Sequence, residues 1–385
     1  MKSILSSVFL SFLTLSVSAQ SEINFHKDWN EAMAEAAKTN KLIFMDAYTT
    51  WCGPCKMMSK NVFTEGKVAA FFNENFVNAK IDMEKGEGPS LARKYRVMAY
   101  PTLLFVDSDG NEVHRAVGYL NPDQFLELGQ VAQDPSKQML FLKKKYEGGD
   151  RSEKVLLNYS NALFDAYSGG HEQVALEYMN LQKDWGTEDN LKYIFKMMEG
   201  IDSPLFGYFK ENKEKFENLF GKDQVERRME SLVYDSIYAM GEVPTPEQVQ
   251  SVFVKAYPEK AAMLTAKYKI RYALEMDNMD QYADATIDYF KKFPSKQADE
   301  YNEAAWNFYE MVDDKKMLKK GVKLAKTSVK LEDGYYNNDT LAALYYKLGK
   351  KKKAIKAAEH AIALAKAEGI DAGETEELLK SIQSM

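Results

Sequence analysis

The sequence predicts an α/β domain followed by a long all-helical region, and three observations support this. The only two cysteines among 385 residues, Cys52 and Cys55, stand three apart, between an apolar stretch of strand length and a helical one. Strand-like and helix-like segments alternate up to about residue 133. After that point, apolar residues recur only at helical spacing. A chain of this length exceeds what one core usually serves, so we expect two domains.

Residues 1–19 have the pattern of a secretory signal peptide. Lys2 supplies the positive charge, an apolar stretch follows, and Val17-Ser18-Ala19 offers small residues for cleavage after Ala19. An uncleaved membrane anchor is the alternative, but the stretch is short and serine-rich for a span. We therefore expect export across the inner membrane, a periplasmic location, and no membrane span after cleavage.

The α/β domain is expected over residues 20–133, with helix caps and turns marking its elements. Asp28 resembles the first residue of a capping box, and Pro122 fits the first turn of a last helix. Asp107-Ser-Asp-Gly110 is a hairpin turn signal. The expected strands are 22–26, 41–48, 76–82, 101–106 and 112–117. The expected helices are 28–38, 53–61, 62–75 (as one helix or a helix-turn-helix), 90–95 and 122–133.

The spacing of the two cysteines favours redox chemistry. Cys52 would begin a helix, where the macrodipole and free N–H groups stabilise a thiolate, so it is the candidate nucleophile. Cys55 would be the resolving thiol. A zinc half-site or an inert thiol pair is the alternative, but His26 and His114 are not spaced as a ligand set. No metal site is expected.

With these residues in place, residues 22–133 resemble the thioredoxin fold. The stretch Trp51–Cys55 is identical to the thioredoxin active-site motif, and Pro101 precedes Thr102 at the place of the family's cis-proline. The stretch from Lys56 to Thr64 is similar to the periplasmic thioredoxin-like domain of transmembrane thiol–disulfide interchange proteins. The resemblance implies a redox-active Cys52–Cys55 disulfide, and such a pair needs no dissociable cofactor.

Asp46 is a candidate proton carrier. It lies inside an apolar strand six residues before Cys52, where burial would raise its pKa. A solvated aspartate at a strand edge is the alternative. The resemblance implies that Asp46 is the family's buried aspartate and that Lys80 is the lysine that accompanies it. The segment from Asp82 to Tyr95 is longer than in thioredoxin, which leaves the register of Lys80 open.

The resemblance also implies a substrate-binding surface. Its candidate residues are Trp51, Gly53, Pro54, Tyr100, Pro101 and Gly118. A packed aromatic is the alternative for Trp51, and an ordinary turn glycine is the alternative for Gly118. The Gly-Pro dipeptide resembles that of reducing thioredoxins. A positive residue between the cysteines would make the site more oxidising, and this dipeptide has none.

Residues 137–385 are expected to be helical, after a linker over 134–136. Small and large residues from Leu341 to Ala361 fall at the positions of a tetratricopeptide helix pair, and a weaker copy precedes them. A tetratricopeptide-like region of this kind would bind a peptide or protein partner. Alternatively, the helices simply pack onto the redox domain or form a dimer.

The expected function is an exported thiol–disulfide oxidoreductase that reduces protein disulfides and takes electrons from a membrane protein. The rival hypothesis is a helical scaffold with a structural thioredoxin fold, and a third possibility is an oxidase or isomerase. The net charge of −6, with no basic and aromatic groove motif, argues against nucleic-acid binding.

Overall fold

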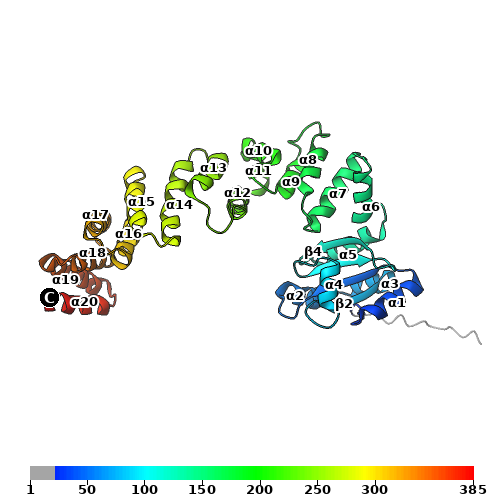
Figure 1. The fold of residues 1–385 in the computed structure, drawn as a ribbon, viewed down its shortest axis with the longest axis horizontal. Helices are drawn as coiled ribbons and strands as arrows, with labels where there is room; N and C mark the ends of the chain where they lie inside the picture. The colour runs from blue at the N-terminus through cyan, green and yellow to red at the C-terminus, as the bar shows by residue number, and fades with distance from the viewer. Residues whose placement is uncertain (1–21) are drawn as a thin grey trace, which may run out of the picture. The chain divides into compact units, whose positions relative to one another are not determined.

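The computed structural model describes residues 22–385 (Figure 1), so the signal peptide predicted over residues 1–19 lies outside the described residues. Internal contacts divide the chain into two compact units, one ending at Glu199 and one over Gly200–Met385. The first contains the α/β domain and the helices that follow it up to Glu199. Between residues 22 and 385, no helix combines the length and apolar character that a membrane span requires.

A mixed four-stranded sheet forms the centre of the α/β domain, in the order β2-β1-β3-β4. Strand β1 (Ile43–Tyr48) pairs parallel with β2 (Val77–Asp82) and antiparallel with β3 (Thr102–Val106). Strand β4 (Glu112–Val117) completes the hairpin with β3. The predicted hairpin is confirmed, and Asp107 Oδ1 accepts the N–H groups of the turn.

Helices cover both faces of this sheet, because residues along each strand alternate between two apolar clusters. On one face, Phe44 packs with residues of α2 (Gly53–Asn61), α3 (Gly66–Asn75) and α5 (Pro122–Gln133). On the other face lie α1 (Trp29–Thr39) and α4 (Gly88–Lys94). The predicted α/β fold class is therefore confirmed.

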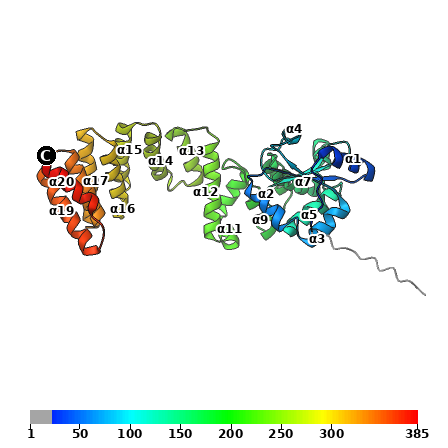
Figure 2. The same cartoon turned by 90° about the horizontal axis from the view of Figure 1, so that it is seen from below.

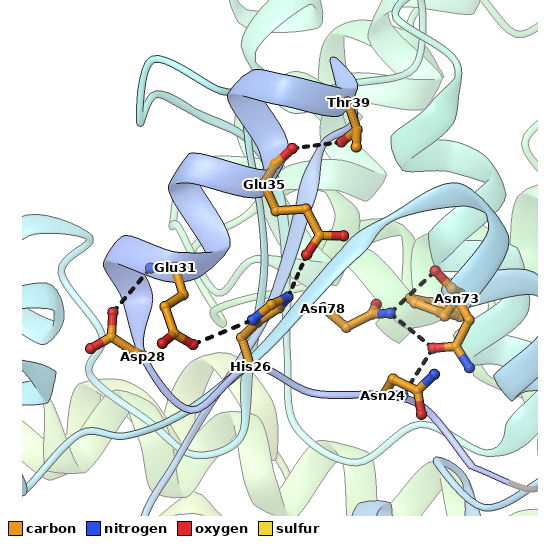
Figure 3. A network of polar contacts seen from close by, with 9 residues as sticks. Asn24, His26, Asp28, Glu31, Glu35, Thr39, Asn73 and Asn78 are labelled. Carbon is orange, nitrogen blue, oxygen red and sulfur yellow. Dashed lines mark hydrogen bonds and ion pairs between the residues drawn. The ribbon is translucent and has the colours of Figure 1, made fainter.

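The strand predicted over residues 22–26 is wrong, because only one bridge forms there, between His26 and Ala79. The backbone N–H of Asn24 instead donates to the Asn73 side chain at 2.9 Å, away from any strand. Two residues after His26, Asp28 accepts the N–H of Glu31 and begins α1 (Figure 3). The extended stretch therefore ends before a ladder can develop.

Helices α6 (Met139–Glu147) and α7 (Glu153–Asp165) pack against β4, at the edge of the sheet. The backbone N–H of Met139 donates to Nδ1 of the buried His114, at 3.3 Å. Burial lowers the pKa of His114 to about 4, so the ring is a neutral acceptor at pH 7. The first helices after the sheet thus belong to the same packed unit as the α/β domain.

The predicted all-helical character after residue 137 is confirmed for the described residues, whereas the tetratricopeptide character stays a prediction. In the second unit, α16 packs beside α17 (Figure 2), and α18 likewise packs against α19. The further helices are α8 (His171–Met179), α9 (Glu188–Met197), α10 (Pro204–Glu211), α11 (Lys213–Phe220), α12 (Lys222–Tyr238), α13 (Pro246–Ala256), α14 (Ala261–Glu275), α15 (Met279–Lys292), α16 (Ala298–Met311), α17 (Lys315–Leu331), α18 (Tyr335–Lys347), α19 (Lys351–Glu368) and α20 (Gly373–Ser384).

Candidate active site

Cys52 and Cys55 are joined in a disulfide at the start of α2. Cys52 is the N-cap residue, and its Sγ accepts the backbone N–H of Cys55 at 3.1 Å. Gly53 and Pro54 form the exposed first turn, where the missing N–H of proline costs no helical hydrogen bond. The N–H donor and the helix dipole both stabilise a negative charge on the sulfur of Cys52.

Trp51 lies on the surface next to this disulfide, with 64% of its area exposed, and is not a core residue. Its Nε1 donates to Glu84 Oε1 at 2.9 Å. Its ring meets the Tyr100 ring edge to face, with centroids 6.0 Å apart. These contacts hold a large apolar side chain in one place, exposed beside the disulfide.

The Tyr100–Pro101 peptide bond is cis, as the resemblance implied. The contact between Tyr100 and Trp51 brings this segment beside the cysteine motif. Gly118 donates its N–H to the carbonyl oxygen of Pro101 at 2.8 Å. Its φ of +97° suits glycine, and a Cβ there would meet no atom within 4 Å. The backbone conformation therefore favours glycine at position 118, while the role of Gly118 in leaving room for a substrate stays a prediction.

Asp46 and Lys80 are directly opposite each other in β1 and β2, on the face covered by α2. Asp46 is fully buried, and its Oδ2 lies 2.9 Å from the Lys80 ammonium. Its Oδ1 has no hydrogen-bond partner among the described residues. Burial raises the pKa of Asp46, and the attraction of Lys80 offsets only part of this effect. The carboxyl group is therefore suited to hold a proton.

Ser59 connects this pair to the cysteines, although the sequence analysis did not single it out. The Lys80 ammonium donates to Ser59 Oγ, which in turn donates to the carbonyl oxygen of Cys55 at 3.0 Å. Cys55, Ser59 and Lys80 also line one surface hollow of about 410 Å³. The four-residue spacing between Cys55 and Ser59, one helical turn, was the only sequence signal for this link.

The described residues contain no cluster of three or more histidine, cysteine or acidic side chains that could hold a metal ion. His26 bonds to Glu35 at 2.8 Å (Figure 3), whereas His114 is buried against Met139. The two histidines considered as zinc ligands thus have separate structural roles.

Comparison with known proteins agrees with this geometry. Residues 29–133 match the family described as thioredoxin-like domain. Thioredoxin from Echinococcus granulosus is 38% identical over 88 residues, which cover 23% of this chain and 76% of that protein. The chain belongs to the thioredoxin-like family.

Other relatives of the thioredoxin-like domain are larger, or are known as solved structures. The thiol:disulfide interchange protein DsbD of Yersinia pestis is 32% identical over 115 residues, which are 28% of this chain and 19% of that protein. The chain thus spans about a fifth of the length of such interchange proteins. The solution structure of a proposed disulphide-isomerase from Bacteroides thetaiotaomicron is 47% identical, covers 30% of this chain and 98% of its own, and has a TM-score of 0.28.

Proposed function

We propose that this thioredoxin-like thiol–disulfide oxidoreductase domain reduces disulfides in exported proteins. The observation that carries the proposal is the position of Cys52 as the cap of α2, with an N–H donor on its sulfur. A thiolate at this position is the species that attacks a disulfide. Trp51 and the Tyr100–Pro101 segment supply the surface on which the protein substrate lies.

The reaction proceeds in two exchanges. The Cys52 thiolate attacks one sulfur of the substrate disulfide, forms a mixed disulfide and releases the other substrate sulfur as a thiolate. The Cys55 thiolate then attacks the Cys52 sulfur, releases the second substrate thiolate and closes the Cys52–Cys55 disulfide. The structure corresponds to this oxidised end state. A dithiol donor must return two electrons and two protons before the next cycle.

Asp46 acts as the proton acceptor for Cys55 in the second exchange. Burial raises the pKa of this carboxyl group toward neutral pH, and a general base is most effective when its pKa lies near the working pH. Lys80 and Ser59 act as positioning residues, because their bonds link the carboxylate to the first turns of α2.

The direction, compartment and partners complete the proposal. The Gly-Pro dipeptide carries no positive charge, which favours a reducing pair, and the likeness to thiol:disulfide interchange proteins supports a role in disulfide traffic. With the predicted signal peptide, the protein acts in the periplasm. A membrane protein supplies its electrons, and the helical region binds or orients a partner.

The equilibrium redox potential of the Cys52–Cys55 pair tests the direction. Thiol trapping of the full chain in defined dithiol buffers should give a value near about −270 mV, the range of thioredoxin. A value near about −120 mV, the range of a strong oxidant, would reverse the proposed electron flow. Failure to form a disulfide under any buffer would contradict an oxidoreductase altogether.

A further inference from the structure

A groove of about 880 Å³ lies within the first unit, between the segment that leads to the cis-proline and helices α6–α8. One wall comes from residues 94–102 and from β4. The other comes from α6, α7 and the Tyr167–Gly170 turn before α8. A thioredoxin-like domain alone would have only the first wall, so the helices that follow it complete the groove.

The groove continues the proposed substrate surface. Met98 and Ala99 line it and immediately precede Tyr100, whose ring touches Trp51 beside the disulfide. The Met98 side chain is 93% exposed, although it is large and apolar. A methionine thioether adapts to apolar side chains of different shape. A substrate segment extended past the cis-proline would therefore reach this groove.

The floor of the groove is apolar. Leu163, Ala166 and Val174 line it, and each is less than 10% exposed. The volume of the groove lies within the range of about 300–1,000 Å³ that is usual for ligand pockets in proteins. The apolar floor would accept aliphatic or aromatic side chains of a bound segment.

The charge of the groove is positive, whereas that of the whole chain is −6. Four basic side chains line it against one carboxylate, Glu112, and Arg115 already binds that carboxylate. Lys94 and Arg96 form no ion pair with an acidic group of the described residues, whereas Lys143 forms an exposed ion pair with Glu147, at 3.8 Å. Lys94 and Arg96 therefore remain available to an acidic ligand, and the solvent-exposed pair of Lys143 is weak enough to be exchanged for one.

We infer that this groove binds an extended, acidic and apolar segment of the protein substrate, next to the disulfide that Cys52 attacks. The inference rests on the proposed function and adds the class of substrate. Helices α6–α8 thus contribute to the choice of substrate directly, by forming one wall of the binding site.

The binding test uses fluorescein-labelled peptides in which serine replaces cysteine, with flanks of alternating glutamate and leucine or of lysine and leucine. Anisotropy with the full chain should show at least about fivefold tighter binding of the acidic peptide at low salt. The preference should fade in about 0.5 M salt, where charges are screened. Equal affinity for the two peptides would overturn the inference.

Two double variants make the test specific, because each changes the net charge by the same amount on the same two helices. Lys94→Glu with Lys143→Glu reverses charges that line the groove and should abolish or invert the preference. Arg93→Glu with Lys144→Glu reverses the charges of two exposed neighbours in sequence that do not line the groove, and should preserve the preference for the acidic peptide. Equal effects of the two variants would indicate only a long-range field and would contradict the groove.

A turnover assay separates this inference from the proposed function. The unaltered protein and the Arg93→Glu with Lys144→Glu variant, whose changed residues do not line the groove, should reduce a disulfide peptide with uncharged glutamine and leucine flanks at the same rate. If that reduction is normal but the acidic preference is absent, only the groove is wrong. If the acidic peptide binds as expected but no variant reduces any peptide, only the proposed function is wrong.

Discussion

The Asp46 carboxyl group is an ionisable group that the fold keeps in an apolar interior, with an ammonium on one oxygen and no hydrogen bond on the other. Burial has a larger effect on its pKa than the ammonium, so the pKa is raised. Below the ordinary value of 3.8, Asp46 is neutral in the folded and the unfolded chain. As the pH rises through the folded-state pKa, the free energy of unfolding falls, because the unfolded chain ionises more readily.

Asp46→Asn should therefore stabilise the protein at pH 7, by about 1 kcal/mol or more, and the gain should vanish below about pH 4. The same variant should lose about tenfold or more in the rate of disulfide reduction near neutral pH, because it lacks the proton acceptor. Urea denaturation at several pH values and a pH profile of the rate check the two effects.

Asp82→Asn is the matched control for Asp46→Asn. Asp82 lies in the neighbouring strand, pairs with Lys85 at 3.3 Å and is partly exposed. Its replacement should change neither stability nor rate by a comparable amount. If Asp46→Asn destabilised the protein at pH 7 and left the rate unchanged, Asp46 would be a structural ion-pair partner and not a proton carrier.

At the scale of single elements, local signals predicted most of the α/β domain. The turn at Asp107–Gly110 and the first helical turn at Pro122 are encoded in a few adjacent residues, and the structure has both elements where the sequence places them. The strand over 22–26 failed because only His26 pairs with β2, at Ala79, while the backbone of Asn24 bonds to the Asn73 side chain. The opposition of Asp46 and Lys80 depends on the register of two parallel strands, which helices α2 and α3 separate in sequence.

The packing of α16 against α17 gives a second prediction. Gly321 of α17 lies so close to α16 that a Cβ there would come within 2.7 Å of Phe308 Cβ. Phe308 is fully buried, so it has no free space into which it could move. Gly321→Ala should lower the free energy of unfolding by about 1–3 kcal/mol, as overpacking does. Urea denaturation of the full chain, followed by circular dichroism, measures this.

Gly207→Ala provides the comparison for Gly321→Ala. Gly207 also lies inside a helix, α10, but a Cβ there would meet no atom within 4 Å. The higher helix propensity of alanine should then stabilise the protein by up to about 1 kcal/mol. If both variants behaved alike, the close approach of α17 to Phe308 would have no energetic importance.

At the scale of the whole molecule, the sequence predicted the arrangement of the cysteine motif better than the surface around it. The motif occupies five adjacent residues, whereas the groove combines residues 94–117 with residues 139–174. Such a surface depends on how α6 and α7 pack against β4, and no short pattern records that packing. The signal peptide and the tetratricopeptide character likewise remain predictions, because no contact among residues 22–385 decides them.

The whole molecule also decides between the enzyme and the scaffold hypotheses. Replacing Cys52 and Cys55 by serine in the full chain removes both redox sulfurs while leaving the helical region unchanged. If the protein acts as a reductant, this variant should fail to restore the wild-type phenotype to a strain that lacks the protein. The single variant Cys55→Ser should also fail, and should accumulate mixed disulfides at Cys52, because the resolving thiol is missing.

Lys94→Glu with Lys143→Glu extends this comparison, since it preserves both cysteines and alters only the groove charges. It should restore the phenotype partially, because uncharged substrates are still reduced while acidic ones are bound less well. Non-reducing electrophoresis and mass spectrometry of the Cys55→Ser adducts would identify the captured segments. Full rescue by the double serine variant would assign the function to the helical region and leave the thioredoxin-like domain as its structural support.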